Sequence, residues 1–378
     1  MGVWDELTGQ ADAVAVFSSA ADANTDDSSM THSWLVTGPP GSGRSNIAYA
    51  FATALLSTGE NDDATARQVA ARTHPDLGVL STERVIISID EVRKLVSTSQ
   101  FSPSVGRYRV MIIEDADRMV ERTSNVLLKA LEEPPPRTVW ILCAPSEADL
   151  IPTIRSRVRS VRLRVPAVDE VAALISRRDN VDLPTATRAA REAQSHIGMA
   201  HRLATNVEAR TRRDETLRIA LSIRSVSDAV RAAGKLLELA GDDAKAITLE
   251  KDAEERASAM RSLGVEPGGT IPPALRAQLK NLDEDQKRRA TRSLRDGLDR
   301  IMVDLLSLYR DILLMQLGAS VELINLSIHS DLLSASERSS AAQTLATMDA
   351  IATARRRIES NVSPALALEA MLISAAGT

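Results

Sequence analysis

A glycine-rich octapeptide near the N-terminus has the composition of a phosphate-binding loop. Residues 38–45 read GPPGSGRS, with glycines at Gly38, Gly41 and Gly43. Glycines there let backbone N–H groups curl around an anion, and the N-terminus of a following helix adds its dipole. Ser45 is the expected magnesium-coordinating hydroxyl, but Arg44 stands where such loops carry lysine. Because a planar guanidinium does not replace a compact ammonium, an ordinary Gly/Pro turn before a helix fits the octapeptide about equally well.

Two adjacent carboxylates follow an apolar run. Glu114 and Asp115 come directly after residues 110–113, VMII. In a nucleotide hydrolase, the first acid at such a strand end holds Mg²⁺ and the second activates water. The usual order is Asp then Glu, and the reversed order here displaces each carboxylate by about one C–C bond, where misplacement costs up to roughly 10²-fold per ångström. A solvated strand end remains the alternative interpretation.

A basic segment without acids runs from residue 155 to residue 164. An arginine such as Arg157, held at the edge of an α/β domain, can reach a neighbour's nucleotide site and neutralise the charge that develops on the γ-phosphoryl group. Such arginine fingers contribute about 10³- to 10⁵-fold in rate. Two other interpretations stay open: a solvated basic face, and a contact with DNA phosphates that would weaken with salt.

The sequence offers no metal-ligand or nucleophile constellation at a recognisable spacing. His196 and His201 are five positions apart and do not share a helix face. The single cysteine, Cys143, lies in an apolar run and is expected in the core. One cysteine also excludes an internal disulfide, which favours a reducing compartment.

Alternating apolar runs and helical patterns in the first 166 residues predict a parallel sheet covered by helices. The expected strands are 33–37, 85–89, 110–113 and 139–143, and the expected helices are 45–56, 90–99 and 124–133. Short amphipathic helices follow at 168–177 and 184–194 and from residue 199. The remainder predicts long helices, 214–239, 283–316 and 335–359, with a Gly/Pro break at 264–273.

Composition limits the classes of function. The chain has 378 residues, a net charge of −5 and 2% aromatic residues. At roughly 150 residues per domain, this length predicts two or three domains, and so few aromatics cannot form a base-stacking platform. No apolar run approaches the roughly 20 residues that span a bilayer, and Asp5 and Glu6 stand where a secretory signal would be basic and apolar. We therefore expect a cytoplasmic protein without membrane contact.

The order of the motifs resembles one family, the clamp-loader subunits of bacterial DNA polymerase III within the AAA+ class. The segments are LTGQ at 7–10, HSWL at 32–35, the octapeptide at 38–45, THPD at 73–76, IDEVR at 89–93, IIEDADRM at 112–119, NVLLKALEEPP at 125–135 and TIRSR at 153–157. The block at 125–135 with the Ser-Arg pair after it is highly specific. The resemblance covers the first 205 residues, and the remainder only by its helical architecture and the ending at 361–372.

Within this family the chain resembles the delta-prime type rather than the ATP-hydrolysing gamma/tau type. Arg44 replaces the loop lysine, Glu114-Asp115 reverses the acid pair, and the strand end at 143–145 lacks the polar residue that senses the γ-phosphate. Losing several electrostatic contributions together leaves little catalysis. The resemblance implies a largely non-hydrolysing stator that keeps Arg157 as a finger for a neighbouring gamma/tau ATPase. The alternative is an active ATPase of the gamma/tau type.

The resemblance also implies a fold, cofactors and partners. The fold would be an α/β AAA+ P-loop domain with a parallel sheet at 1–166, a small three-helix lid at 167–207 and an all-α collar at 208–378 that assembles a ring. Family members commonly carry zinc-binding cysteines before the THPD segment, but residues 55–73 contain none. We therefore expect no metal or other cofactor, and weak ATP binding or none.

The expected partners are the gamma/tau and delta subunits, with the sliding clamp and primed DNA reached through the DNA polymerase III holoenzyme. The collar's apolar stripe, Ile301, Leu305, Leu308 and Ile312, would bury against neighbouring subunits or, alternatively, only within this chain. The resemblance assigns no role to residues 242–273.

Overall fold

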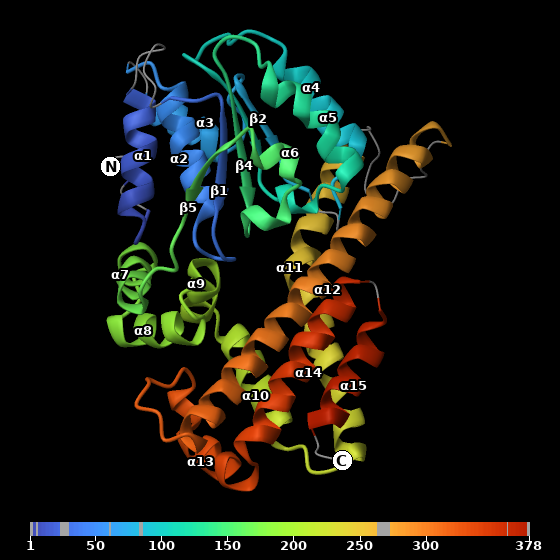
Figure 1. The fold of residues 1–378 in the computed structure, drawn as a ribbon. Coiled ribbons are helices and arrows are strands. Elements are labelled where there is room, and N and C mark those ends of the chain that lie inside the picture. The colour runs from blue at the N-terminus through green and yellow to red at the C-terminus, as the bar shows by residue number, and fades with distance from the viewer. Residues whose placement is uncertain are drawn as a thin grey trace. The chain divides into compact units, whose positions relative to one another are not determined.

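A computed structural model describes residues 3–4, 7–22, 30–59, 62–82, 86–262, 273–360 and 362–375. The chain forms two compact units, Met1–Thr205 and Asn206–Thr378, and each unit has its own hydrophobic core. The predicted lid helices belong to the first unit (Figure 1). The finer division at residues 166 and 207 stays a prediction.

The first unit contains a five-stranded parallel sheet in the order β2-β3-β4-β1-β5 (Figure 1). The strands are β1 Ser33–Thr37, β2 Leu77–Leu80, β3 Arg109–Ile113, β4 Thr138–Ala144 and β5 Arg159–Arg162. The expected strands at 33–37, 110–113 and 139–143 are confirmed. The short edge strand β5 is rich in arginine, which suits a sheet edge that must not pair with other chains.

The expected strand at 85–89 is wrong. Val85 lies outside the described residues, Ile87 makes only an isolated bridge with Met119, and Ile89 already begins helix α4, Ile89–Ser99. The side chains of Ser88 and Glu91 form a reciprocal capping box at that point. Because the cap satisfies the first N–H groups of a helix, it overrides the β-type apolar run, and Leu77–Leu80 supplies the strand instead.

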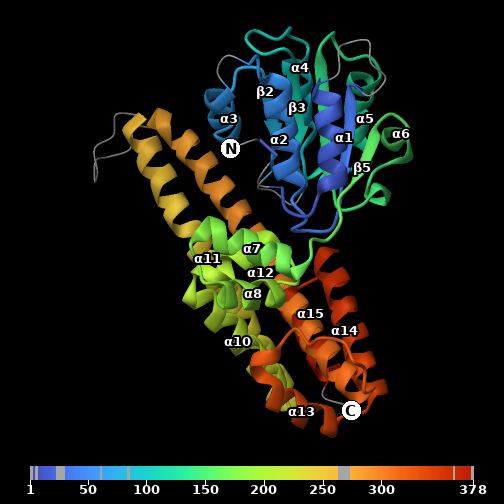
Figure 2. The ribbon, with the colours of Figure 1, turned by 90° about the vertical axis from the view of Figure 1, so that its left-hand side faces the viewer.

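Helices cover both faces of the sheet, and alternate strand residues supply the two cores. Trp34 and Val36 of β1 pack with helices α1 and α2, whereas Leu35 packs with α4 and α5. Figure 2 shows α1 and α2 in front of the sheet. The helices of this part are α1 Ala11–Asp22, α2 Arg44–Leu56, α3 Asp62–Ala70, α4, α5 Glu121–Glu132 and α6 Pro152–Arg155, with single turns at η1 Ala116–Arg118 and η2 Glu147–Asp149.

Three short helices complete the first unit. They are α7 Val168–Asp179, α8 Leu183–Glu192 and α9 Ile197–Thr205, and they pack on one another as the sequence predicts. Two consecutive residues with positive φ, Gln194 at 51° and Ser195 at 62°, form the turn that leads into α9. This backbone conformation is uncommon for residues with a Cβ, and it sets the position of His196, the next residue.

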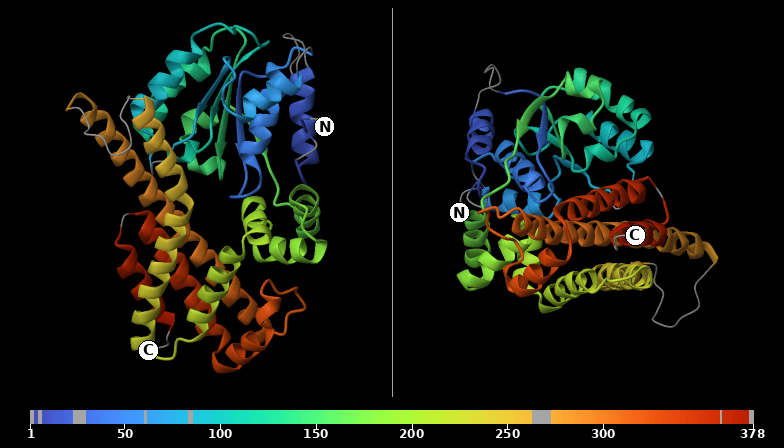
Figure 3. Two further views of the ribbon diagram at one scale, coloured as in Figure 1. Left: turned by 180° about the vertical axis from the view of Figure 1, so that it is seen from behind. Right: turned by 60° about the horizontal axis from the view of Figure 1, so that its bottom comes forward.

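The second unit is all-helical in the described residues. It contains α10 Val207–Leu221, α11 Val226–Ser262, α12 Pro273–Gln316, η3 Leu326–Ile328, α13 His329–Arg338, α14 Ala341–Glu359 and α15 Pro364–Ala375. Helices α11 and α12 run side by side (Figure 3). The expected Gly/Pro break lies outside the described residues, except for Pro273, which begins α12.

Two of the expected long helices are interrupted. The helix predicted at 214–239 ends at Leu221 and resumes at Val226, where the Ser225 side chain and the Asp228 carboxylate make a new N-terminal turn. The helix predicted at 335–359 breaks before α14, because Ser340 and Gln343 form a capping box there. Local capping therefore divides segments whose apolar periodicity looks continuous.

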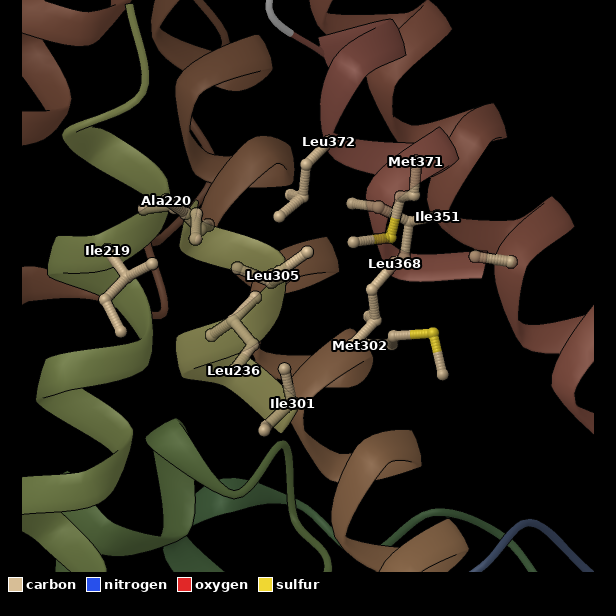
Figure 4. Close-up of a cluster of buried hydrophobic side chains, with 14 of the residues drawn as sticks. Ile219, Ala220, Leu236, Ile301, Met302, Leu305, Ile351, Leu368, Met371 and Leu372 are labelled. Atoms are coloured by element: carbon tan, nitrogen blue, oxygen red, sulfur yellow. The ribbon is translucent and has the colours of Figure 1, made fainter. Parts of the chain in front are cut away.

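The apolar stripe of α12 packs inside this unit. Ile301, Leu305, Leu308 and Ile312 are all less than 10% exposed and belong to one core cluster with α10, α11, α14 and α15. Figure 4 shows Ile301 and Leu305 near Leu236 of α11. Of the two interpretations offered by the sequence, burial within the chain is correct, so this stripe is not a surface for other subunits.

Candidate functional site

The octapeptide forms a loop between β1 and α2, as predicted. Gly41 and Gly43 have φ of 82° and 90°, a region that glycine enters without the steric cost that a Cβ brings. Arg44 is the first residue of α2, and Ser45 is the second. The loop thus has the strand–turn–helix setting of a phosphate loop.

Several polar groups of the loop are already used within the chain. The Gly38 N–H donates to the Pro145 carbonyl at 3.2 Å, and the Ser42 N–H donates to the Pro39 carbonyl at 3.1 Å. The Arg44 guanidinium folds back and donates to the Gly38 carbonyl. Within the described part of the chain, the buried Ser42 hydroxyl has no hydrogen-bond partner. Arg44 therefore binds its own loop rather than extending towards an anion.

The imidazole of His196 lies directly on the loop. A Cβ built on Gly41 would stand 2.2 Å from the His196 Cγ, and the Ile197 N–H donates to the Gly41 carbonyl at 3.4 Å. The His196 Nδ1 accepts the Met199 N–H at 3.2 Å, which fixes the ring. The turn before α9 and the loop after β1 are consequently packed against each other.

Glu114 is engaged by two side chains. Its Oε1 accepts hydrogen bonds from the Tyr49 hydroxyl of α2 and from the Arg72 guanidinium at 2.9 Å. The Arg72 guanidinium also lies 5.6 Å from the centre of the Tyr49 ring. Burial, followed by the hydrogen bond to Glu114, raises the pKa of Tyr49 far above its ordinary value, so the phenol stays protonated and donates.

Asp115 and the end of strand β4 lie at the same carboxyl end of the sheet. The Oδ2 atom of Asp115 lies 3.8 Å from the Nε atom of Arg118. Strand β4, between β3 and β1, ends at the apolar Ala144, and Pro145 follows it. Cys143 is fully buried, as expected for a core residue, and burial raises the pKa of its thiol to about 12.

These residues do not fit a magnesium–nucleotide site of the hydrolytic kind. Its lysine is replaced by Arg44, which is folded back on Gly38; its first acid, Glu114, already pairs with a guanidinium; and the intervening strand end is apolar. A site of that kind needs free acidic oxygens for the metal and donors aimed at phosphate. We therefore derive no chemical step through such a group on this chain.

Arg157 stands apart from these groups. It follows α6, and its guanidinium forms an ion pair with Glu132, the last residue of α5. Both residues line an open hollow of ≈ 450 Å³, together with His32, Leu131 and Ser156. The side chain of Arg157 is 34% exposed.

The position of Arg157 relative to the loop follows from the strand register. Arg159 of β5 pairs with Trp34 near the start of β1, so Arg157 lies at the amino end of these parallel strands, while the loop follows their carboxyl end. A five-residue strand at about 3.3 Å per residue is roughly 16 Å long. The structure thus brings the loop, Glu114 and Asp115 together at the carboxyl ends of the strands and leaves Arg157 at the amino ends.

The other arginines of the basic segment are partly occupied. Arg164 pairs with Glu170 at 2.6 Å, and the Arg159 guanidinium lies 5.0 Å from the centre of the Trp34 ring. The segment is therefore not a continuous row of free cations of the kind that a DNA-phosphate contact favours.

Sequence reasoning did not find four side chains that shape these sites: Tyr49, Arg72, Glu132 and His196. Glu132 lies inside the quoted block at 125–135, so that block did carry a signal. Arg72 and His196 act through contacts with distant parts of the chain, and nothing in their spacing points to them.

Across the residues that the structure describes, no group of three or more His, Cys, Asp or Glu side chains is arranged to hold a metal ion. No helix in the same part of the chain is long and apolar enough to cross a membrane.

Comparison with known proteins gives a match in the N-terminal part of this chain. The sequence profile of the family described as "DNA polymerase III, delta subunit" matches residues 9–167. The DNA polymerase III subunit delta′ of Pseudomonas aeruginosa is 37% identical over 134 residues, which cover 33% of this chain and 41% of that protein. Residues 9–167 thus resemble the DNA polymerase III clamp-loader subunits of the delta-prime type. The subunit delta′ of Escherichia coli is 29% identical over 154 residues, 39% of this chain and 46% of that protein.

The matches to clamp-loader subunits cover only part of each relative. The gamma/tau subunit of Mycobacterium tuberculosis is 27% identical over 179 residues, 46% of this chain and 30% of that protein. The chain spans less than half the length of these relatives. Among solved structures, a DNA polymerase III gamma subunit-related protein from Thermotoga maritima covers 90% of this chain and 92% of its own, with 18% identity and a TM-score of 0.39.

Proposed function

We propose that this chain is a delta-prime-type subunit of the DNA polymerase III clamp loader, and that it supplies Arg157 to the ATP site of a neighbouring gamma/tau subunit. In this role it hydrolyses little or no ATP itself. Through the complex with gamma/tau and delta subunits, it helps load the sliding clamp on primed DNA during replication.

The position of Arg157 is the observation that carries the proposal. The guanidinium lies at the amino end of the strands, with the chain's own phosphate loop at the carboxyl end. An arginine at the amino end of the strands is too far from the phosphate loop of its own chain to act there, and this position fits a role at another subunit's nucleotide. Fingers supplied in trans stabilise the charge of the transferring phosphoryl group.

The engaged state of the loop supports the non-hydrolysing part of the proposal. Arg44, Gly41 and Glu114 are each bound by other groups of this chain. Opening such a site for Mg²⁺ and ATP would break all three contacts at once, so we expect weak ATP binding or none.

An active ATPase of the gamma/tau type is the second candidate. The two left-handed glycines and the unpartnered Ser42 hydroxyl favour it, because both are features that a phosphate-binding loop needs. Calorimetric titration of the chain with Mg²⁺-ATP separates the two candidates, since tight binding accompanied by turnover would support the ATPase.

Substitution of the finger tests the proposal. The chain is reconstituted with gamma/tau and delta subunits, and steady-state ATP turnover is measured for the wild type, Arg157→Ala and Arg155→Ala. Arg155 is the matched control because it is an exposed arginine two residues away. Arg157→Ala should slow hydrolysis at the neighbouring site by about 10³-fold or more. Total ATP turnover should then fall by the fraction that this site contributes. Equal turnover for the three proteins, with unchanged assembly, would refute the finger.

A further inference from the structure

Glu132 contacts Arg157 in a way that orients the guanidinium and leaves part of it open. We propose that Glu132 is a positioning residue, which holds Arg157 so that its Nη2 edge points out of the domain towards a neighbouring subunit. The inference rests on the proposed function, because it explains how the finger is prepared for use in trans.

The hydrogen bonds of Arg157 engage two of the three guanidinium nitrogens, Nε and Nη1. An arginine has five N–H donors in a fixed plane. The Nε–H donates to the Glu132 carboxylate, and Nη1 donates to the Thr153 carbonyl at 2.7 Å and to the Ser156 hydroxyl at 3.0 Å. Among the described residues, Nη2 has no hydrogen-bond partner. The two N–H donors of Nη2 therefore remain for an incoming anion.

The two segments that carry the pair are fixed to one core. Leu131, next to Glu132, and Ile154, three residues before Arg157, are fully buried in the same cluster. The Arg157 N–H donates to the Ile154 carbonyl at 2.9 Å, and a ring nitrogen of His32 lies 2.9 Å from the Leu131 carbonyl. Backbones anchored in this way hold a functional side chain more accurately than a free loop does.

The geometry favours orientation over inhibition. A carboxylate that blocked the finger would occupy the donors of Nη2, but Glu132 binds Nε and leaves Nη2 open. The pair is also only partly covered, with the Arg157 and Glu132 side chains 34% and 45% exposed. Exposed ion pairs of this kind contribute little to folding, so its loss should leave the domain folded while the guanidinium samples more orientations.

The first test compares neighbouring glutamates. Glu133 is exposed, carries the same charge and stands one residue after Glu132, so Glu133→Ala is the matched control for Glu132→Ala. In the reconstituted loader, Glu132→Ala should lower kcat at the neighbouring site by roughly 10-fold, less than the roughly 10²-fold of an ångström misplacement, with KM for ATP unchanged. Glu132→Gln keeps an acceptor oxygen and should recover part of the loss. Equal kcat for Glu132→Ala and Glu133→Ala would overturn the inference.

A combined variant shows whether Glu132 acts through Arg157. In an Arg157→Ala background, Glu132→Ala should cause no further fall in kcat, because the group that it positions is gone. A further fall of the same size would overturn the positioning role and indicate a structural one. If Arg157→Ala lowers kcat and Glu132→Ala does not, only this inference fails.

A measurement on the chain alone keeps the inference testable if the proposed function fails, that is, if Arg157→Ala leaves turnover unchanged. The Nε–H resonance of Arg157 should exchange slowly with water in the wild type and in Glu133→Ala. It should exchange several-fold faster in Glu132→Ala. The same exchange rate in all three proteins would overturn the inference whatever the ATPase assay gives.

Discussion

At the scale of single residues, the carboxylate of Asp76 explains why the THPD segment is part of the pattern. Ser104 donates to Oδ1 through its N–H at 2.7 Å and its hydroxyl at 2.9 Å. The N–H groups of Val105 and Gly106 donate to Oδ2 at 2.7 and 2.8 Å, and Arg109 pairs with Oδ1 at 2.9 Å. Asp76 thereby ties the loop before β3 to the sheet, which is a structural role rather than a catalytic one.

Asp76 makes stability depend on pH. Burial alone would raise its pKa, but the N–H donors of Gly106, Val105 and Ser104 outweigh burial and lower the pKa below its ordinary value. Since the pKa is lower in the folded than in the unfolded state, the stabilisation is complete above about pH 4 and is lost as the pH falls through the folded value. Asp76→Asn should remove this dependence and lower the free energy of unfolding by about 3 kcal/mol, because Arg109 loses its partner.

Urea unfolding between about pH 3 and pH 7 measures this effect. Asp90→Asn is the control, since Asp90 is 87% exposed in its side chain and pairs with the exposed Arg93. Identical pH profiles for the wild type and Asp76→Asn would contradict the role of Asp76.

Sequence alone selected the residues of the octapeptide, the acid pair and Arg157 as candidates, because each stands in a local pattern with a physical meaning. It did not identify what those residues touch. Arg72 reaches Glu114 from 42 positions away, and His196 reaches Gly41 only because of the turn before α9. Contacts of this kind depend on tertiary packing, which spacing along the chain does not encode.

At the scale of elements, the periodicity of apolar residues predicted the buried strands and most helices. It gave wrong boundaries where side-chain caps begin a helix. The run at 85–89 has the composition of a strand, but the capping box of Ser88 and Glu91 starts a helix inside it. The break between α10 and α11 has the same origin, in the hydrogen bonds of Ser225 and Asp228. Element type was thus predictable where burial dominates, and boundaries were less so where side-chain caps compete.

The contact between the loop and the turn before α9 gives a prediction at this scale. Gly41→Ala places a Cβ against the His196 ring and also puts an alanine at a φ of 82°. The backbone cost alone is about 1 kcal/mol, and the clash adds to it. In a His196→Ala background the clash is absent, so Gly41→Ala should then cost only the backbone part.

Urea unfolding of the four proteins in this double-mutant cycle measures the coupling. Gly59→Ala is the control, because Gly59 has a φ of 85° but nothing within 4 Å of its added Cβ. Additive effects of Gly41→Ala and His196→Ala would show that the ring does not press on the loop.

At the scale of the whole molecule, the chain divides into a unit that carries Arg157 and a helical unit with a separate core. The apolar stripe of α12 is buried within that core. Any assembly through the second unit must therefore use other surfaces, and the family resemblance predicts such assembly.

The second unit should fold and assemble without the first. A fragment of residues 206–378 contains an apolar core of its own among its described residues, so we expect a helical circular dichroism spectrum and one cooperative thermal transition. If this unit is a collar, the fragment should also co-purify with gamma/tau subunits. A folded fragment that fails to co-purify, while the full chain succeeds, would contradict the collar role.

ATP turnover, followed as this chain is titrated into a fixed amount of gamma/tau and delta subunits, tests the central claim most directly. The account predicts no turnover by the chain alone and turnover that rises until the complex is saturated, with a rise that is preserved in Arg155→Ala and lost in Arg157→Ala. Turnover by the chain alone, or an equal rise with Arg157→Ala, would contradict the account.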